Sequence, residues 1–289
     1  MRAPRQTANL DSPFWWGSHR LFGIDPRNPA AIAPVNALLA ELSPIPVPRV
    51  LRTAALAGRS CLIVEHLPGA RLDNFNDLPL PAIETLGTAI ARIHTHRFPH
   101  WGSLSGSTHQ PLAAFHQDLA ATLRGLVARF FAHDAPLAAA LDAMCTLAAH
   151  LPPPADAALV MLDVDGTQFL TDGTHLTGLV DTDAYAIAPR ALDLIAYEFE
   201  LDVPRAAAFA RGYRTLLPSP TSAPSAPSTA TSSASSKSRA PSPSPSGSAG
   251  HTTSRSEKWE GRIQKRHRTQ LVLIPTSHLP LPTSRPDAV

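Results

Sequence analysis

Residues 219–256 set the firmest limit on what this chain can fold into. Of these 38 residues, 26 are Ser, Thr or Pro, and none is Val, Ile, Leu, Met, Phe, Tyr or Trp. Ordering a residue costs about 1–2 kcal/mol, and a segment with no large apolar side chain buries too little surface to offset that cost. The sequence therefore predicts that the folded body ends near residue 218 and that residues 219–289 form a disordered tail.

Charge changes at the same boundary. Residues 1–218 contain sixteen Arg, no Lys and twenty Asp or Glu, which gives a net charge of −4. Residues 219–289 contain nine basic and three acidic residues, a net charge of +6. A basic run such as 258–268 can bind nucleic acid, but in a disordered tail we expect it to be solvated and we predict no nucleic-acid partner.

Composition excludes several classes of protein. Two cysteines, Cys61 and Cys145, are too few for a disulfide scaffold or a cysteine-rich zinc module. No run of about 20 apolar residues that would span a membrane is present, and the N-terminus lacks the apolar core of a secretory signal. The expectation is a cytoplasmic protein with no membrane partner, and its oligomeric state stays open.

Hydrophobic spacing predicts a mixture of helices and strands in residues 1–218. Apolar residues at helical spacing, and short apolar runs bounded by Gly and Pro, distinguish the two kinds of element. The predicted helices are residues 30–42, 82–94, 112–131, 136–151, 191–201 and 205–217. The predicted strands are residues 50–56, 61–65 and 158–162, followed by a hairpin of 168–170 and 175–180 around an Asp-Gly turn. This order favours an α+β fold.

Four acidic side chains follow two of the predicted strands. Asp163 and Asp165 come directly after one apolar strand, and Asp181 and Asp183 come directly after another. Carboxylates at strand ends joined by a hairpin can converge on Mg²⁺, which prefers oxygen ligands. The alternative is that these acids cap turns and face water. The number of acids at this position makes a site the favoured interpretation.

Five stretches of the body occur in the order seen in one known family. They are residues 62–69 (LIVEHLPG), 86–94 (LGTAIARIH), 161–168 (MLDVDGTQ), 178–181 (GLVD) and 188–194 (APRALDL). Together they resemble the aminoglycoside phosphotransferase and choline kinase family. The resemblance implies an α+β, protein-kinase-like fold with a small lobe at 1–67 and a helical large lobe at 68–218. It also implies transfer of the ATP γ-phosphate to a hydroxyl or amine of a small-molecule acceptor, with ATP and Mg²⁺ as cofactors.

The resemblance also implies a role for each matching residue. Asp163 would accept the proton of the substrate hydroxyl. The metal ligands would be Asp181, Gln168 in place of the family's Asn, and Asp165 in place of a His. The backbone at the hinge between the lobes, formed by Glu65, His66 and Leu67, would face adenine.

The N-terminal sixty residues depart from the family pattern. The first sixty residues contain only three glycines, so no glycine-rich loop covers the phosphates, and no Lys is present before residue 219. Arg20 is the predicted substitute, because a guanidinium stays charged and can bind phosphate through two N–H groups.

Two alternatives remain open. Residues 159–167 (LVMLDVDGT) match the signature of haloacid dehalogenase-like phosphatases, in which Asp163 would be the nucleophile. Such enzymes need a downstream Lys and a parallel sheet, and every Lys after Asp163 lies in the tail. The second alternative is a kinase-like protein that has lost phosphate transfer, which the missing Lys and glycine-rich loop favour.

Overall fold

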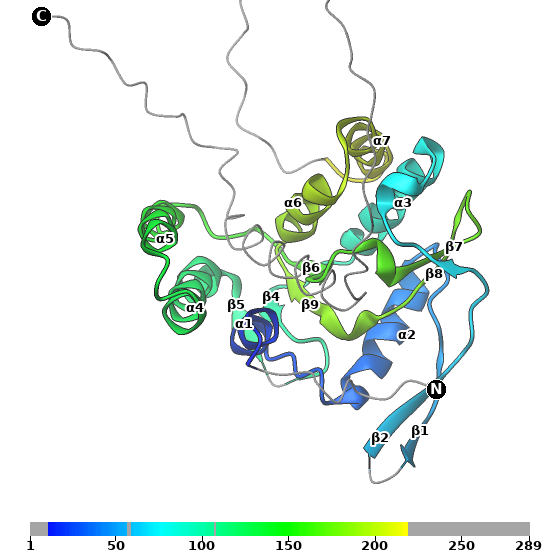
Figure 1. Cartoon of the computed structure of the whole chain (residues 1–289), viewed down its shortest axis with the longest axis horizontal. Coiled ribbons are helices and arrows are strands. Elements are labelled where there is room, and N and C mark those ends of the chain that lie inside the picture. Colours follow the sequence, from blue (N-terminus) through cyan, green and yellow to red (C-terminus); the bar gives the residue numbers. More distant parts are fainter. Residues whose placement is uncertain (1–10, 57–58, 107, 219–289) are drawn as a thin grey trace, which may run out of the picture.

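The computed structural model describes residues 11–56, 59–106 and 108–218. The predicted disorder and basic character of residues 219–289 therefore lie outside the described residues. Within the described ranges the chain forms seven α-helices and nine strands, with helices packed around three small sheets (Figure 1). No helix in these ranges is long and apolar enough to cross a membrane.

The helices and strands have the following bounds. The helices are α1 (Pro13–Phe22), α2 (Ile32–Leu42), α3 (Leu80–Thr95), α4 (Phe115–Phe130), α5 (Ala135–Ala148), α6 (Ala191–Glu200) and α7 (Val203–Arg214). The strands are β1 (Val50–Leu56), β2 (Arg59–Val64), β3 (Ala70–Arg71), β4 (His100–Gly102), β5 (His109–Pro111), β6 (Ala158–Met161), β7 (Phe169–Thr171), β8 (Leu176–Leu179) and β9 (Tyr185–Ala188).

Every helix and strand that the sequence predicts is present, with ends shifted by at most a few residues. The prediction missed α1 and the short strands β3, β4, β5 and β9. Strands β3, β4 and β5 are two or three residues long, too short for an alternating pattern to be visible. Helix α1 did carry signals: Ser12 caps its first turn, Pro13 is its first residue, and Gly23 ends it in the left-handed region at φ 73°.

The strands form three antiparallel sheets. Strands β1 and β2 pair alone, β3-β7-β8 form a second sheet, and β5-β4-β9-β6 form a third. Every pairing among the described strands is antiparallel. The phosphatase alternative needs a parallel sheet, so it is wrong for this chain.

Helices α3 and α7 form the centre of the largest apolar core. Their backbones approach so closely that a side chain at Gly87 would collide with the Phe209 carbonyl, and one at Gly212 with the Glu84 carbonyl. Two glycines therefore allow the crossing. The core extends from α3 to buried residues of β6 and β7, which brings the strands that precede and follow the predicted catalytic loop onto one rigid support.

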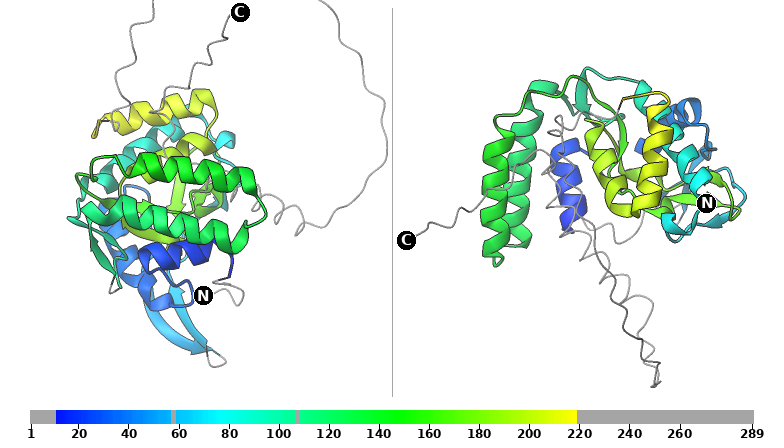
Figure 2. Two further views of the ribbon diagram at one scale, coloured as in Figure 1. Left: turned by 90° about the vertical axis from the view of Figure 1, so that its left-hand side faces the viewer. Right: turned by 90° about the horizontal axis from the view of Figure 1, so that it is seen from above.

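Helix α1 lies within the predicted small lobe of residues 1–67 and contacts elements of the predicted large lobe; the lobe bounds stay a prediction. It packs on α4, where Trp16 meets Phe130 edge to face with ring centroids 6.0 Å apart, and its Phe22 packs on Trp101 of β4. Figure 2 shows α1 beside the α4–α5 pair. Helix α1 thus packs on a helix of the predicted large lobe, while α2, β1 and β2 contact one another.

Candidate active site

The predicted catalytic loop leaves a fully buried strand. All four residues of β6 are buried, and the chain then turns through a 3₁₀ helix, Gly166–Gln168. The Asp165 carboxylate caps this turn by accepting a hydrogen bond from the Thr167 N–H at 2.8 Å. The turn directs the Gln168 side chain back to Asp163, whose Oδ2 accepts a hydrogen bond from Gln168 Nε2 at 3.3 Å.

The β7–β8 hairpin brings Asp181 to the same place. The Val180 N–H donates to the Gln168 carbonyl at 2.7 Å, which fixes the residue before Asp181 beside the end of the loop. Asp181 has φ 61° and ψ 53°, and among the described residues it is the only non-glycine with positive φ. Such strain persists where the surrounding structure holds the residue, and it is frequent at functional sites. The structure thus joins Gln168 to Asp163 directly and places Asp181 one residue beyond the backbone contact with Gln168.

The residues present fit a magnesium ion. Gln168 is 4% exposed, and its amide oxygen Oε1 is buried without a hydrogen-bond partner among the described residues. Its amide nitrogen donates to Asp163, so the oxygen is left to receive another group. No three His, Cys, Asp or Glu side chains of the described chain could hold a metal by themselves. Mg²⁺ is usually held by one or two carboxylates together with the phosphates of the substrate.

Asp165 makes hydrogen bonds within the predicted catalytic loop. One of its carboxylate oxygens caps the Gly166–Gln168 turn, and its carbonyl accepts the Gln168 N–H at 3.1 Å. Asp165 thereby shapes the loop that orients Gln168. Its role as a metal ligand stays a prediction.

The predicted hinge residues follow β2 and lie over β8. The Glu65 N–H donates to the Arg49 carbonyl at 2.9 Å, and the Glu65 carboxylate pairs with Arg49 at 3.0 Å. Leu67 packs against Gly178, and the Thr177 hydroxyl donates to the Pro68 carbonyl at 2.8 Å. The hinge is therefore tied to the strand that leads to Asp181. The roles of Glu65, His66 and Leu67 toward adenine stay predictions.

Arg20 lies on α1, between Trp16 and α4. Its guanidinium carbon sits 5.5 Å from the centroid of the Trp16 ring, and its Nε lies near Gly125 of α4. Helix α1, which carries Arg20, packs on α4 (Figure 1). The role of Arg20 toward phosphate stays a prediction. The sequence could not reveal the packing of α1, because α1 is fixed by contacts with residues about a hundred positions away.

Comparison with known proteins identifies the family. The family model described as "Phosphotransferase enzyme family" matches residues 23–222, more than half of the chain. This chain belongs to the phosphotransferase enzyme family. The mixed α+β, kinase-like fold that the sequence predicts is thereby confirmed.

Solved structures similar to this phosphotransferase-family chain are distant. Macrolide 2'-phosphotransferase MphH from Brachybacterium faecium is 17% identical with a TM-score of 0.46, covering 66% of this chain and 66% of that chain. The gentamicin complex of APH(2")-IIa is 13% identical with a TM-score of 0.44, covering 65% and 67%. The GDP complex of aminoglycoside 2'-phosphotransferase-IIIa is 16% identical with a TM-score of 0.44, covering 64% and 65%. No curated protein sequence matches.

One contact beside Asp181 could not be found from the sequence. Asn36 of α2 is 4% exposed; its Oδ1 accepts a hydrogen bond from the Thr182 hydroxyl, and its Nδ2 donates to the Pro48 carbonyl at 2.8 Å. Thr182 directly follows Asp181. Asn36 therefore ties α2 and the segment before β1 to the strained turn, although nothing in the sequence around Asn36 singles it out.

A buried hydrogen-bond network supports the start of the predicted catalytic loop. The Asp193 Oδ1 atom accepts the Met161 N–H at 2.8 Å, and Oδ2 contacts His94 Nε2 at 3.0 Å. His94 Nδ1 contacts the Tyr213 hydroxyl at 3.0 Å. Burial raises the pKa of Asp193, while the hydrogen bond from His94 lowers it. Asp193 thus holds the backbone at Met161, two residues before Asp163.

Glu200, at the end of α6, lies close enough to Asp163 for the two carboxylates to interact electrostatically. Burial, and secondarily the charge of Asp163, raise the pKa of Glu200 from 4.5 to about 7. The proximity of Glu200 to Asp163 could not be predicted from the sequence, because the two residues are 37 positions apart.

The raised pKa makes the stability of the fold depend on pH. Between pH 4.5 and about 7 the folded state binds more protons at Glu200 than the unfolded state does, so this contribution to stability falls as pH rises. We expect Glu200→Gln to match the wild type at pH 4.5 and to be more stable at pH 8, by on the order of 1 kcal/mol, which is less than the full pKa shift because solvent screens the half-buried carboxyl. Thermal melts at both pH values check this. Equal melting temperatures at pH 8 would contradict the shifted pKa.

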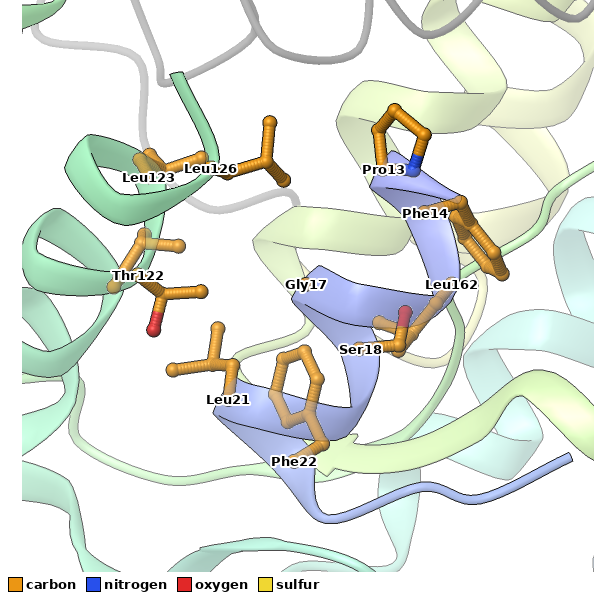
Figure 3. Close-up of a pocket in the computed structure, with 11 residues that line it drawn as sticks. Pro13, Phe14, Gly17, Ser18, Leu21, Phe22, Thr122, Leu123, Leu126 and Leu162 are labelled. Carbon is orange, nitrogen blue, oxygen red and sulfur yellow. The ribbon is translucent and has the colours of Figure 1, made fainter. Parts of the chain in front are cut away.

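A mostly apolar cavity lies beside the predicted catalytic loop. It has a volume of about 190 Å³ and lies between α1 and α4, with Leu162 in its wall (Figure 3). Ser18 and Thr122 are the only side chains with a polar atom among its eleven lining residues. Since Leu162 precedes Asp163, this space adjoins the catalytic loop.

Proposed function

We propose that this protein transfers the γ-phosphoryl group of ATP to a hydroxyl or amine of a small molecule. The observation that carries the proposal is the hydrogen bond from Gln168 to Asp163 beside the strained turn at Asp181. These are the three residues for which the family resemblance implies a base and two metal ligands. The identity of the acceptor is not part of the proposal.

Each side chain of the candidate site would have its own role in phosphoryl transfer. Asp163 would take the proton of the acceptor, and the hydrogen bond from Gln168 Nε2 fixes the direction in which its carboxylate faces. Asp181 and the Gln168 Oε1 atom would hold Mg²⁺, which when bound neutralises charge on the transferred phosphoryl group. The Asp193–Met161 hydrogen bond keeps the backbone before Asp163 in place. The small-molecule acceptor would enter beside Leu162.

A kinase-like protein without phosphate transfer is the second candidate. It is favoured by the absence of Lys from residues 1–218 and by the position of Arg20 against Trp16. The two candidates differ in whether nucleotide binding depends on Mg²⁺. A haloacid dehalogenase-like function is not proposed, because the sheets are antiparallel.

A thermal shift of the full chain separates the two candidates. With ATP and Mg²⁺ at about 100 times Kd, we expect a gain of about 2.7 kcal/mol in folding stability, and with ATP and EDTA no gain. Asp181→Asn should lose the Mg²⁺-dependent gain because it removes one metal-binding charge. Asp142→Asn, an equal charge change on exposed α5, is the matched control and should keep it. A cooperatively folded wild type with no shift would support the second candidate.

A further inference from the structure

The turn at Asp181 has a backbone conformation that needs support from its surroundings. Asp181 has φ 61° and ψ 53°, in the left-handed region, where the Cβ atom of a residue comes too close to the following carbonyl oxygen. A residue with a side chain stays in this region only where the surrounding structure holds it there. Asp181 is a predicted metal ligand, so the groups that hold the turn also fix the direction of its carboxylate.

Backbone hydrogen bonds hold the chain on both sides of the turn. The Val180 N–H donates to the Gln168 carbonyl at 2.7 Å, and the Leu162 N–H donates to the Ala184 carbonyl at 3.0 Å. Both bonds use the main chain, so they can form with almost any side chain at these positions. The turn lies between these two bonds, and a side-chain contact supports it there.

Thr182 and Asn36 make this side-chain contact. Thr182 is 1% exposed and Asn36 is 4% exposed, and the Thr182 hydroxyl donates a hydrogen bond to Asn36 Oδ1. The Asn36 Nδ2 atom donates to the Pro48 carbonyl at 2.8 Å. Turning the amide over would place its oxygen against the Pro48 carbonyl, and two acceptors do not bond. Only the observed orientation of the amide therefore satisfies both groups.

Asn36 is itself held in place from two sides. It lies within α2, one turn before Leu39, which is fully buried in the largest core. The segment before β1 that accepts its Nδ2 hydrogen bond also bonds to β8, because the Leu179 N–H donates to the Pro46 carbonyl at 2.8 Å. Helix α2, this segment and the turn at Asp181 are thus joined by hydrogen bonds, and the bond between Asn36 and the turn depends on two specific side chains.

We propose that Asn36, acting through Thr182, is a positioning residue that sets the affinity of the candidate site for Mg²⁺. This step rests on the proposed function, in which Asp181 is a metal ligand. Without the bond from Thr182, the turn would relax toward backbone conformations with negative φ, and the Asp181 carboxylate would change direction. Substituting a group that orients a metal ligand typically weakens metal binding by about 10–100-fold.

The test compares two substitutions of Thr182 in the full chain. Thr182→Val keeps the branched shape and removes the hydroxyl, whereas Thr182→Ser keeps the hydroxyl. We expect Thr182→Val to need about tenfold more Mg²⁺ than the wild type for half-maximal ATP binding, measured by calorimetry. Thr182→Ser should stay within about twofold of the wild-type concentration, because the hydroxyl can still donate to Asn36.

Thr171→Val is the matched control. It makes the same chemical change at a buried hydroxyl on the far end of the β7–β8 hairpin, where Thr171 donates to the His175 carbonyl at 2.7 Å. It should leave the Mg²⁺ requirement unchanged. Asn36→Leu, which is similar in size to asparagine, should raise the requirement as Thr182→Val does. The double variant should add little to either, because both substitutions remove the same bond.

A second measurement needs no nucleotide. Hydrogen exchange of the Val180 amide reports opening of the turn, because this N–H is bonded to the Gln168 carbonyl. We expect exchange at Val180 to be about tenfold faster in Thr182→Val than in the wild type or Thr182→Ser. Thr171→Val should leave exchange at Val180 unchanged.

Two results would overturn the proposal. One is a wild-type Mg²⁺ requirement in Thr182→Val, and the other is unchanged exchange at Val180 in that variant. Should Thr182→Val fail to fold, Thr182→Ala removes the same hydroxyl and takes its place. Failure of the proposed function would appear differently, as wild-type ATP binding that is absent or does not depend on Mg²⁺. Exchange at Val180 then decides whether Asn36 holds the turn.

Discussion

Replacing Asp163 by asparagine should reduce phosphoryl transfer by about 10²–10⁴-fold while leaving Mg²⁺-dependent nucleotide binding nearly unchanged. Asparagine keeps an oxygen that accepts the hydrogen bond from Gln168 Nε2, so the loop retains its shape. The substitution removes only the carboxylate that would take the proton of the acceptor. The measurement is ADP release at saturating ATP and Mg²⁺, together with nucleotide affinity by calorimetry.

Asp142→Asn is the control for this experiment. It makes the same chemical change on exposed α5, where Asp142 meets Arg124 at 3.3 Å, and should leave both readouts unchanged. ADP release by Asp163→Asn at the wild-type rate would show that Asp163 is not the base. Loss of nucleotide binding by Asp163→Asn would instead place Asp163 among the metal ligands.

Replacing Asp193 by alanine should destabilise the fold more than any other single change considered. The variant leaves two buried groups unsatisfied, the Met161 N–H and the His94 ring, and removing one member of such a buried pair costs about 3–5 kcal/mol. For a body of this size, that loss lowers the melting temperature by roughly 10 °C or more. Thermal denaturation followed by circular dichroism measures it.

Two variants separate the parts of the Asp193 network. Asp193→Asn keeps an acceptor for the Met161 N–H and should fall between wild type and alanine. Tyr213→Phe keeps the Asp193 carboxylate and removes the hydroxyl that contacts His94 Nδ1 and accepts a hydrogen bond from Arg190, and it should cost about 1 kcal/mol. A melting temperature of Asp193→Ala within about 2 °C of wild type would show that the network does not support the loop.

The core of the candidate site could be predicted because it is local in the sequence. Asp163 and Gln168 are five residues apart on one loop, and the β7–β8 hairpin returns the chain to that loop at Asp181. A hairpin with an Asp-Gly turn has only one short way to close, so strand pattern and turn chemistry were sufficient to bring these residues together. The hydrogen bond from the Thr167 N–H to the Asp165 carboxylate was not predicted, because a sequence pattern does not show which of several nearby groups a carboxylate contacts.

The sequence by itself determined the α+β composition and most helix and strand positions. Only the tertiary structure decided that α1 packs on α4 and carries Arg20 with it, that Asn36 holds Thr182, and that Asp193 supports Met161. Short-range order follows from hydrophobic period and turn residues, which are read within a window of a few residues. The contacts of Asp193 with Met161 and of Asn36 with Thr182 join residues 32 and 146 positions apart. Such contacts depend on which faces of the helices meet in the core, and a local sequence pattern does not show which faces meet.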